Sequence, residues 1–505
     1  MKNISKLILL SLIAVFTSCN DAIDIDQVGR LRAENAFSSV DDLEAGLLAV
    51  YGQLDLTPEI ALSANFTDEI AIGFDSGGQG FALYDFVLNA ESAAASSFWV
   101  RNFIVNNRAT VLLEAAENVE ILDEDEQERF NNVLAQTHFI RAFSNFELLI
   151  YFSPDPRDDS TLAVPVVDFV PEQLTFTALR DTTGEVWDYI NADVNRALEL
   201  STVEFGGGDF TPTFASVQAI NALRARMAIT RGQYGVADAL ATDLLNTFGL
   251  ADRTQYQNMF LDSDNTEIIW KLERTLNDAY DGQGATGSVF AGGWAGARFA
   301  FGSATLDGSP YFEMDRSVFD LLDPADIRFT VNVAPTSVIS NDYLNDPDPV
   351  NNDILVIQKY IGSEGQPLMN DLKVFRSSEM LLIAAEARAA GPAQDLAGAA
   401  ALIKQLRDAR FGTDQPLDVY NSQQEAFQAI LQERKIELCY EGHRYKDLKR
   451  LGPDANVGVD RDPIACEIQS GACELPATDF RFTLPIPIVE INANPGIAAQ
   501  QNPGY

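Results

Sequence analysis

Two adjoining stretches late in the chain combine helical periodicity with a high density of opposite charges. In residues 426–438 the apolar side chains recur at steps of three and four residues, which predicts one apolar face of a helix. Gly442 suits the left-handed residue that ends a helix, and a shorter helix is predicted over residues 443–451, ending before Gly452-Pro453. The charged residues on these two helices are Glu433, Arg434, Glu437, Glu441, Arg444 and Asp447. Charges held partly out of water need partners, so we expect mutual ion pairs, although a solvated charged helix shows the same pattern.

Helical periodicity recurs through most of the chain, and in two regions it comes in pairs. Residues 216–245 predict two helices separated by Gly232, and residues 376–390 and 396–410 predict a second pair. Small residues alternate with large ones in the first pair, as in tetratricopeptide repeats, where they let paired helices approach closely. Further helices are predicted from about residue 36 and over 99–119, 127–152 and 182–200, with a short strand over 267–272. The expected fold class is mostly α, a tetratricopeptide-like scaffold of helical pairs with a loop-rich, mixed ligand-binding part.

The N-terminal residues predict a processing signal and not a part of the fold. Lys2 and Lys6 precede an apolar run over residues 7–16, which is too short to span a bilayer, and small residues then precede Cys19. This arrangement resembles a bacterial lipobox. The resemblance implies that residues 1–18 are removed, that Cys19 carries acyl chains such as palmitate, and that residues 19–31 form a tether. A plain secretory signal followed by an ordinary cysteine would also fit these residues.

The remaining cysteines and the acidic loops bear on disulfides and metals. Cys439 lies within the charged helical stretch and is expected to be a small buried apolar residue. Cys466 and Cys473 bracket a short polar loop, and in an exported chain this spacing favours a disulfide over a zinc site. The oxygen-rich stretch from Asp342 to Asp353 leaves calcium open, but proline–aspartate turns explain it equally well. No metal site and no cofactor are therefore favoured.

Charge and missing motifs exclude several function classes. The 505 residues carry a formal net charge of −39, and such a surface repels nucleic acid. A strongly anionic ligand would need a local basic pocket for the same reason. Both histidines lie in predicted helices, and the chain contains no HExxH, GxSxG or P-loop lysine motif. We therefore expect no enzymatic activity and assign no catalytic residue.

Three motifs together resemble one family. They are ERKIEL-x2-EGHRYKDLKRLG at 433–452, AQTHFIRAFSNFELLIYF at 135–152 and FTLPIPIVEINANPGIAAQQNPGY at 482–505. All three are similar to motifs of the SusD/RagB family, the surface nutrient-binding lipoproteins of Bacteroidetes. The resemblance implies a SusD-like fold, with an N-terminal part over 32–260 and a C-terminal part over 261–505 that packs on the same scaffold.

The resemblance also implies a function in nutrient uptake. It predicts a lipid-anchored protein on the outer-membrane surface that binds glycan and delivers it to a SusC-like TonB-dependent transporter during polysaccharide utilisation. A peptide-binding lid like that of the RagB branch would share every framework motif. A lipoprotein glycosidase, or a purely structural lipoprotein of the transporter complex, would also be compatible with these residues.

The candidate ligand-binding residues come from two loop regions. Sugar rings have apolar faces that stack on aromatic side chains, and their hydroxyl groups need hydrogen-bond partners. Residues 65–98 and 277–310 are rich in glycine and aromatic residues and lack periodicity, and the family builds its ligand site from comparable loops. The candidates are Phe81, Tyr84, Tyr280, Trp294 and Arg298. Each of these aromatic residues could instead form a core contact beneath its loop, as we expect for Trp99, Trp187 and Trp270.

Overall fold

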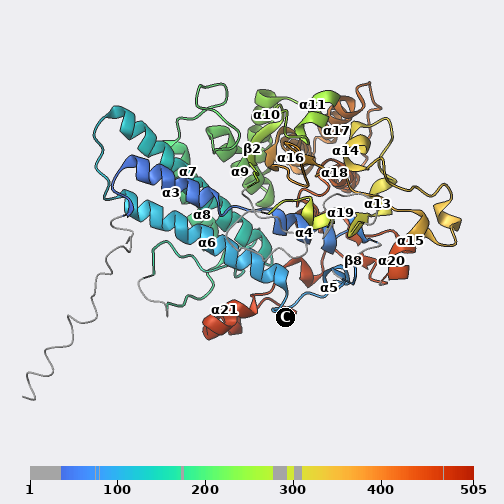
Figure 1. Ribbon diagram of the computed structural model, residues 1–505, viewed down its shortest axis with the longest axis horizontal. Coiled ribbons are helices and arrows are strands. Elements are labelled where there is room, and N and C mark those ends of the chain that lie inside the picture. The colour runs from blue at the N-terminus through green and yellow to red at the C-terminus, as the bar shows by residue number, and fades with distance from the viewer. Residues whose placement is uncertain are drawn as a thin grey trace, which may run out of the picture.

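The fold is dominated by helices, as the periodicity predicted (Figure 1). The computed structural model describes residues 36–73, 76–78, 80–171, 176–276, 293–300, 310–469 and 471–505. The predicted signal peptide, tether and Cys19 lie outside these ranges, as does Tyr280. None of the helices in the described ranges combines the length and the apolar character needed to cross a membrane.

Four long helices lie side by side at one end of the molecule (Figure 1). They are α3 (Val40–Tyr51), α6 (Ala93–Ala116), α7 (Glu124–Phe152) and α8 (Thr183–Leu200). Local sequence fixes where three of them begin, because Ser39, Asp123 and Thr182 accept hydrogen bonds from backbone N–H groups of the first turn. From Phe139 to Phe152 α7 is buried on all sides, since other helices and the C-terminal segment surround it.

The two predicted helical pairs are confirmed. They are α9 (Val217–Thr230) with α10 (Tyr234–Phe248), and α16 (Ser377–Ala390) with α17 (Leu396–Phe411). Gly232 connects the first pair at φ +71°, a conformation that favours glycine. Ala237 and Ala241 are fully buried where α10 packs against both α9 and α16. The small residues of the pattern therefore lie where the helices approach one another.

The charged stretch forms α18 (Gln423–Glu437) and α19 (Arg444–Ala455). Gly442 lies between them at φ +83°, as predicted. The predicted end of the second helix before Gly452-Pro453 is wrong, because α19 continues through both residues. A proline this close to a helix end removes only one of the last hydrogen bonds, and Asn456, at φ +54°, ends the helix instead.

Short helices and strands complete the chain. The helices are α4 (Thr57–Phe66), α5 (Phe81–Tyr84), α11 (Arg253–Met259), α12 (Ala297–Ala300), α13 (Arg316–Phe319), α14 (Ile327–Asn332), α15 (Pro349–Asn352), α20 (Pro463–Gln469) and α21 (Ile488–Ala493). The strands are β1 (Ile70–Ile72), β2 (Ile268–Leu272), β3 (Phe312–Met314), β4 (Gly362–Ser363), β5 (Gln366–Pro367), β6 (Leu372–Arg376), β7 (Val459–Asp460) and β8 (Glu474–Leu475). They pair antiparallel as β1–β3, β2–β6, β4–β5 and β7–β8, and β2 is the predicted strand.

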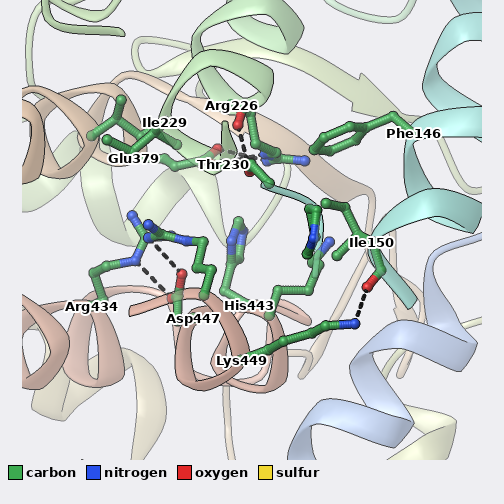
Figure 2. Close-up of a pocket in the computed structure, with 14 residues that line it drawn as sticks. Phe146, Ile150, Arg226, Ile229, Thr230, Glu379, Arg434, His443, Asp447 and Lys449 are labelled. Carbon is green, nitrogen blue, oxygen red and sulfur yellow. Dashed lines mark hydrogen bonds and ion pairs between the residues drawn. The ribbon is translucent and has the colours of Figure 1, made fainter. Parts of the chain in front are cut away.

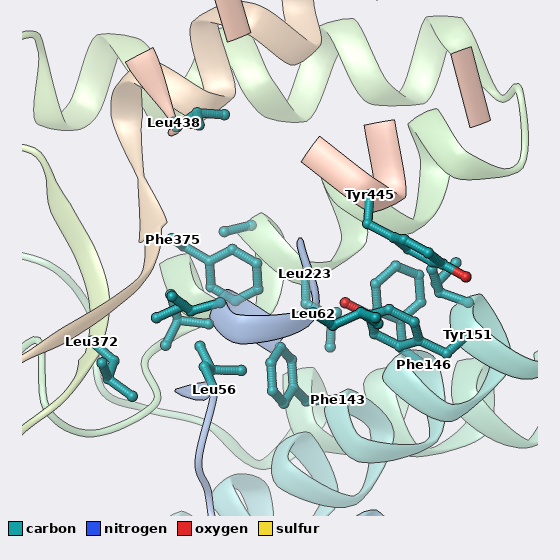
Figure 3. Packing of buried hydrophobic residues seen from close by; sticks show 14 of the residues in the cluster. Leu56, Leu62, Phe143, Phe146, Tyr151, Leu223, Leu372, Phe375, Leu438 and Tyr445 are labelled. Carbon is teal, nitrogen blue, oxygen red and sulfur yellow. The ribbon is translucent and has the colours of Figure 1, made fainter. Parts of the chain in front are cut away.

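The main hydrophobic core joins elements from both halves of the chain. Figure 3 shows side chains of α7, α9 and β6 meeting in one cluster, with Phe143 and Phe375 near its centre. The rings of Phe143 and Phe375 both contact the indole of Trp270, which is fully buried in β2. Trp99 and Trp187 are buried as well, so the expectation that these three tryptophans are core residues is confirmed.

Near the C-terminus, a disulfide links α20 to the residues that follow it. The predicted disulfide between Cys466 and Cys473 is present, with the two Cα atoms 5.6 Å apart. Cys439 is a free cysteine and is fully buried, as expected for a small apolar residue. The side-chain amide of Gln469, inside the cross-linked segment, exchanges hydrogen bonds with the backbone N–H and carbonyl of Ile72 in β1. The cross-linked loop thus positions a residue that pairs with a strand from the other end of the chain.

Candidate functional site

The predicted loop aromatics are less exposed than sugar stacking requires. Tyr84 is fully buried, so its prediction as an exposed binding platform is wrong. The guanidinium of Arg461 lies 3.7 Å from the centroid of the Tyr84 ring and donates hydrogen bonds to backbone carbonyls, including that of Tyr84. Phe81 is partly buried against the core from the first turn of α5. The first loop region therefore places its aromatic rings mainly inward.

The second loop region is attached to the scaffold through an arginine. Trp294 is 8% exposed and packs in a small cluster with Ala297 and Met369, so its ring is also covered. Arg298 is half-buried and donates a hydrogen bond from Nη2 to the hydroxyl of Thr57, 3.0 Å away. Thr57 in turn donates to Asp55, a buried carboxylate. Arg298 therefore connects residues 293–299 to the start of α4.

An open pocket with aromatic walls lies elsewhere, between α6, residues 165–171 and 176–178, and α21. Its volume is about 450 Å³. Phe169 and Phe176 are 45% and 42% exposed, and their rings meet edge to face with centroids 5.2 Å apart. Trp99 and Phe103 also line the pocket, with ring centroids 5.0 Å apart. Hereafter this is called the aromatic pocket.

The spacing of residues in α6 explains one wall of the aromatic pocket. Trp99, Phe103 and Asn107 follow one another at four-residue steps and therefore share one face of the helix. The indole N–H of Trp99 donates to the carboxylate of Glu490 in α21 at 3.1 Å, which fixes the ring. Asn107 is exposed, so its amide group is open to solvent. The wall thus combines a fixed apolar surface with polar groups, which is the combination that a sugar ring requires.

The aromatic pocket was not predicted from the sequence. Phe169 and Phe176 lie in a proline-broken stretch, and nothing in their neighbours distinguishes an exposed ring from a buried one. The available signal was the pair of phenylalanines around Pro171 in a segment that lacks the periodicity of a buried element.

Comparison with known proteins gives the same family for both sequence and fold. The sequence model of the SusD family matches residues 336–505. The SusD-like protein P2 of Formosa agariphila is 25% identical, and the alignment covers 99% of each chain. Residues 336–505 therefore match the SusD family in sequence, and the chain as a whole resembles SusD-like proteins.

Solved structures of SusD-like proteins are similar to this structure over nearly its whole length. A SusD superfamily protein from Bacteroides thetaiotaomicron is similar with a TM-score of 0.74 and 22% identity, covering 92% of this chain and 100% of the other. Surface glycan-binding protein A from the same species, solved in complex with laminarihexaose, gives a TM-score of 0.68 at 16% identity, covering 92% and 99%. These identities establish a shared fold.

Within the region that matches the SusD family, the signature helices α18 and α19 carry a buried charge network. The expectation of mutual pairing is correct for Arg434 with Asp447, whose Nε and Oδ2 atoms are 2.7 Å apart. It is wrong for the other four residues, because their side chains point toward neighbouring elements. Glu433 pairs with Arg328 and Arg407, Glu437 with Arg376 and Arg410, Glu441 with Arg376 and Lys359, and Arg444 with Asp68.

Burial and neighbouring charges set the ionisation of this network. Burial alone would raise the pKa of Glu437, but the arginines Arg410 and Arg376 hold it far below the ordinary value. The same competition keeps the pKa of Asp68 low, beside Arg444 and Lys435. Both carboxylates therefore stay charged at neutral pH. The network ties α18 and α19 to β6, α17 and the end of α4, which is a structural role.

A small cavity lies beside the signature helices (Figure 2). Its volume is about 30 Å³, which is room for one or two water molecules. Figure 2 shows His443 inside it, between the Arg226–Glu379 and Arg434–Asp447 ion pairs. Burial lowers the pKa of His443 well below its usual range, so the ring is neutral. The cavity is too small for a nutrient.

Within the described residues, no group of three or more histidine, cysteine, aspartate or glutamate side chains is arranged to hold a metal ion. In the oxygen-rich stretch, Asp346 accepts hydrogen bonds from Ser340, Asn352 and the backbone of Asp348. Asp353 accepts from Arg316. These partners give the carboxylates turn-forming and pairing roles.

Proposed function

We propose that this SusD-like protein binds glycan at the cell surface, with the aromatic pocket as its binding site. The observation that carries the proposal is the exposed pair Phe169 and Phe176 at a pocket of about 450 Å³. Exposed phenylalanine rings cost free energy in water, and two of them lining one open pocket offer a surface for the apolar face of a sugar. The glycan complex of a protein with the same fold supports glycan as the class of ligand.

Binding in the aromatic pocket would combine stacking with a few directional hydrogen bonds. The sugar ring stacks on Phe169 or Phe176, and the amide of Asn107 bonds its hydroxyl groups. Glu490 holds the Trp99 ring in place, so the wall is preorganised and little side-chain entropy is lost on binding. No step of this scheme breaks a covalent bond, so the protein acts as a binding protein and not as an enzyme.

The rest of the proposal concerns location and delivery. Acyl chains on Cys19 anchor the protein at the outer membrane, and a SusC-like TonB-dependent transporter receives the bound glycan. Tethering both proteins in one membrane raises the effective concentration of each at the other, so a modest intrinsic affinity is sufficient. Of the loop residues, Phe81, Tyr280 and Arg298 remain proposed ligand contacts, as does Trp294 after a movement that uncovers its ring.

Calorimetric titration of the full-length protein in detergent tests the proposal. A panel of bacterial, plant and algal oligosaccharides, with laminarihexaose among them, is compared with a set of peptides. We expect an oligosaccharide to bind, and Phe169→Ala with Phe176→Ala to weaken it about tenfold or more, the loss of about 1.4 kcal/mol expected from stacking.

The matched control is Phe205→Ala. Phe205 is 44% exposed and also contacts other phenylalanine rings, but it does not line the aromatic pocket. Its removal should leave the affinity unchanged. Binding of peptides alone would favour a RagB-like lid, and cleavage of any bound glycan would favour a glycosidase. A glycan affinity that the double substitution leaves unchanged would contradict the assignment of the pocket.

A further inference from the structure

A second open pocket, of about 410 Å³, is lined by different residues from those of the aromatic pocket. It lies between the turn after α7 (Pro154–Arg157), the last turn of α19, and residues 477–483 with Pro503. We propose that it is a second sugar-binding site, which takes one neutral pyranose ring stacked on Phe480. The inference rests on the proposed function for its ligand class, but on separate residues for its geometry. Hereafter it is called the Phe480 pocket.

Phe480 provides a rigid exposed ring. It is 43% exposed, and its centroid lies 5.1 Å from that of Tyr505, edge to face. The Tyr505 hydroxyl donates to the carbonyl of Thr483 at 2.9 Å, which holds the second ring in place. Gly504, at φ +96°, packs directly against Phe480, where any side chain would collide with the ring. The ring is therefore supported from one side while it remains open to the pocket.

Lys449 also lines the Phe480 pocket. Its Nζ donates to the carbonyl of Ile150 (Figure 2) and to that of Ser153, both at 2.7 Å, at the C-terminal end of α7. An ammonium group has three N–H bonds, and the described residues supply acceptors for two of them. No described carboxylate forms an ion pair with it, and burial lowers the pKa of Lys449 to about 7. In the charged form of Lys449, which dominates below pH 7, the third N–H is available to a ligand hydroxyl oxygen.

The charges around the Phe480 pocket favour a neutral ligand. Its cationic side chains are Arg157, Lys449 and Arg450, and its carboxylates are Asp155, Asp454 and Asp479. Arg450 pairs with Asp447, and Asp479 accepts two hydrogen bonds from Arg481 at 2.8 and 2.9 Å. The balance leaves no excess of positive charge to attract an acidic sugar. The exposed carboxylate of Asp155 at the rim can accept hydrogen bonds from sugar hydroxyl groups.

Saturation-transfer NMR tests the inference on the full-length protein in detergent. The background variant carries Phe169→Ala and Phe176→Ala, so that the aromatic pocket does not contribute. The probes are methyl β-D-glucopyranoside, methyl α-D-mannopyranoside and methyl β-D-galactopyranoside. We expect transfer to the ring C–H protons of at least one sugar, and Phe480→Ala should reduce its affinity by about three- to tenfold. Lys449→Met, which keeps the apolar stem, should reduce it by about tenfold.

Phe205→Ala in the same background is the control and should leave the transfer unchanged, and far-UV circular dichroism checks that each variant is folded. Transfer that Phe480→Ala leaves intact would overturn the inference, as would the absence of transfer from all three sugars. The two proposals can fail separately. Loss of all glycan binding in the background variant would overturn the Phe480 pocket alone, whereas unchanged glycan binding there would overturn the aromatic pocket alone.

Discussion

Replacing Glu437 with glutamine removes a negative charge that the structure holds between two arginines. Its Oε1 accepts hydrogen bonds from Nη1 of Arg376 at 3.0 Å and Nη2 of Arg410 at 2.9 Å, and its Oε2 accepts from Nε of Arg410 at 3.1 Å. The side chains of Glu437 and Arg410 are 0% exposed and that of Arg376 is 2% exposed. Glutamine keeps the volume but turns an NH₂ group toward guanidinium N–H groups, so donor faces donor.

The expected loss in the free energy of unfolding depends on the ion pairs that the two arginines keep. Breaking a buried ion pair costs about 3–5 kcal/mol. Arg376 keeps Glu441, at 2.8 Å, and Arg410 keeps Glu267, at 2.7 Å, so neither becomes an isolated charge. We therefore expect the lower end, about 3 kcal/mol. For a chain of this length the entropy of unfolding is roughly 1 kcal/mol per kelvin, so Tm should fall by about 3 °C.

Differential scanning calorimetry together with guanidinium unfolding measures this effect. The control is Glu199→Gln, because Glu199 pairs with Arg196 on the surface, where the two side chains are 65% and 50% exposed. That substitution should change the free energy of unfolding by less than about 0.5 kcal/mol. A loss for Glu437→Gln below about 1 kcal/mol, or no larger than the control, would refute the view that the signature charges stabilise the fold.

Three further predictions concern other buried groups. Burial raises the pKa of Glu69 from 4.5 to about 7, so its stabilising contribution is complete below pH 4.5 and is lost as pH rises through 7. Glu69→Gln should abolish about 3 kcal/mol of that pH dependence between pH 4 and 8 in urea titrations, and a slope equal to the wild type would contradict this. Cys466→Ser with Cys473→Ala opens a short loop and should cost roughly 2 kcal/mol in guanidinium unfolding. The reduced wild type should then unfold at nearly the same guanidinium concentration as this double variant, and a clear difference would show that the cysteine side chains matter apart from their bond. Arg461→Met leaves the carbonyls around Tyr84 without their donor and should lower the free energy of unfolding by about 3 kcal/mol or more, whereas a neutral result would mean that water replaces the guanidinium.

The sequence predicted the parts of the fold that depend on near neighbours. The helical periodicity of α9, α10, α16 and α17 depends only on nearby residues, so the predicted bounds of these helices were correct to within a few residues. The partners of the signature charges were not predictable in this way. Glu437 pairs with residues 27 and 61 positions away, and a helical period shows which face is charged but not what that face contacts.

The candidate site was harder to predict for the same reason. Tyr84 lies in a loop of suitable composition, but its ring is covered by Arg461, which is 377 residues further along the chain. Phe169 and Phe176 lie in a stretch without a distinctive pattern and remain exposed because no distant element covers them within the described residues. Exposure of a loop aromatic depends on such distant contacts, and composition carries no information about them.

The position of Asp68 has a consequence for how the protein is made. Its buried carboxylate forms ion pairs with Lys435 and Arg444, which follow 367 and 376 residues later in the chain. Ribosomes deliver the N-terminus first, so during synthesis the early helices cannot close around Asp68 without trapping a lone charge. We expect the nascent first half to stay loosely collapsed until the last seventy residues arrive.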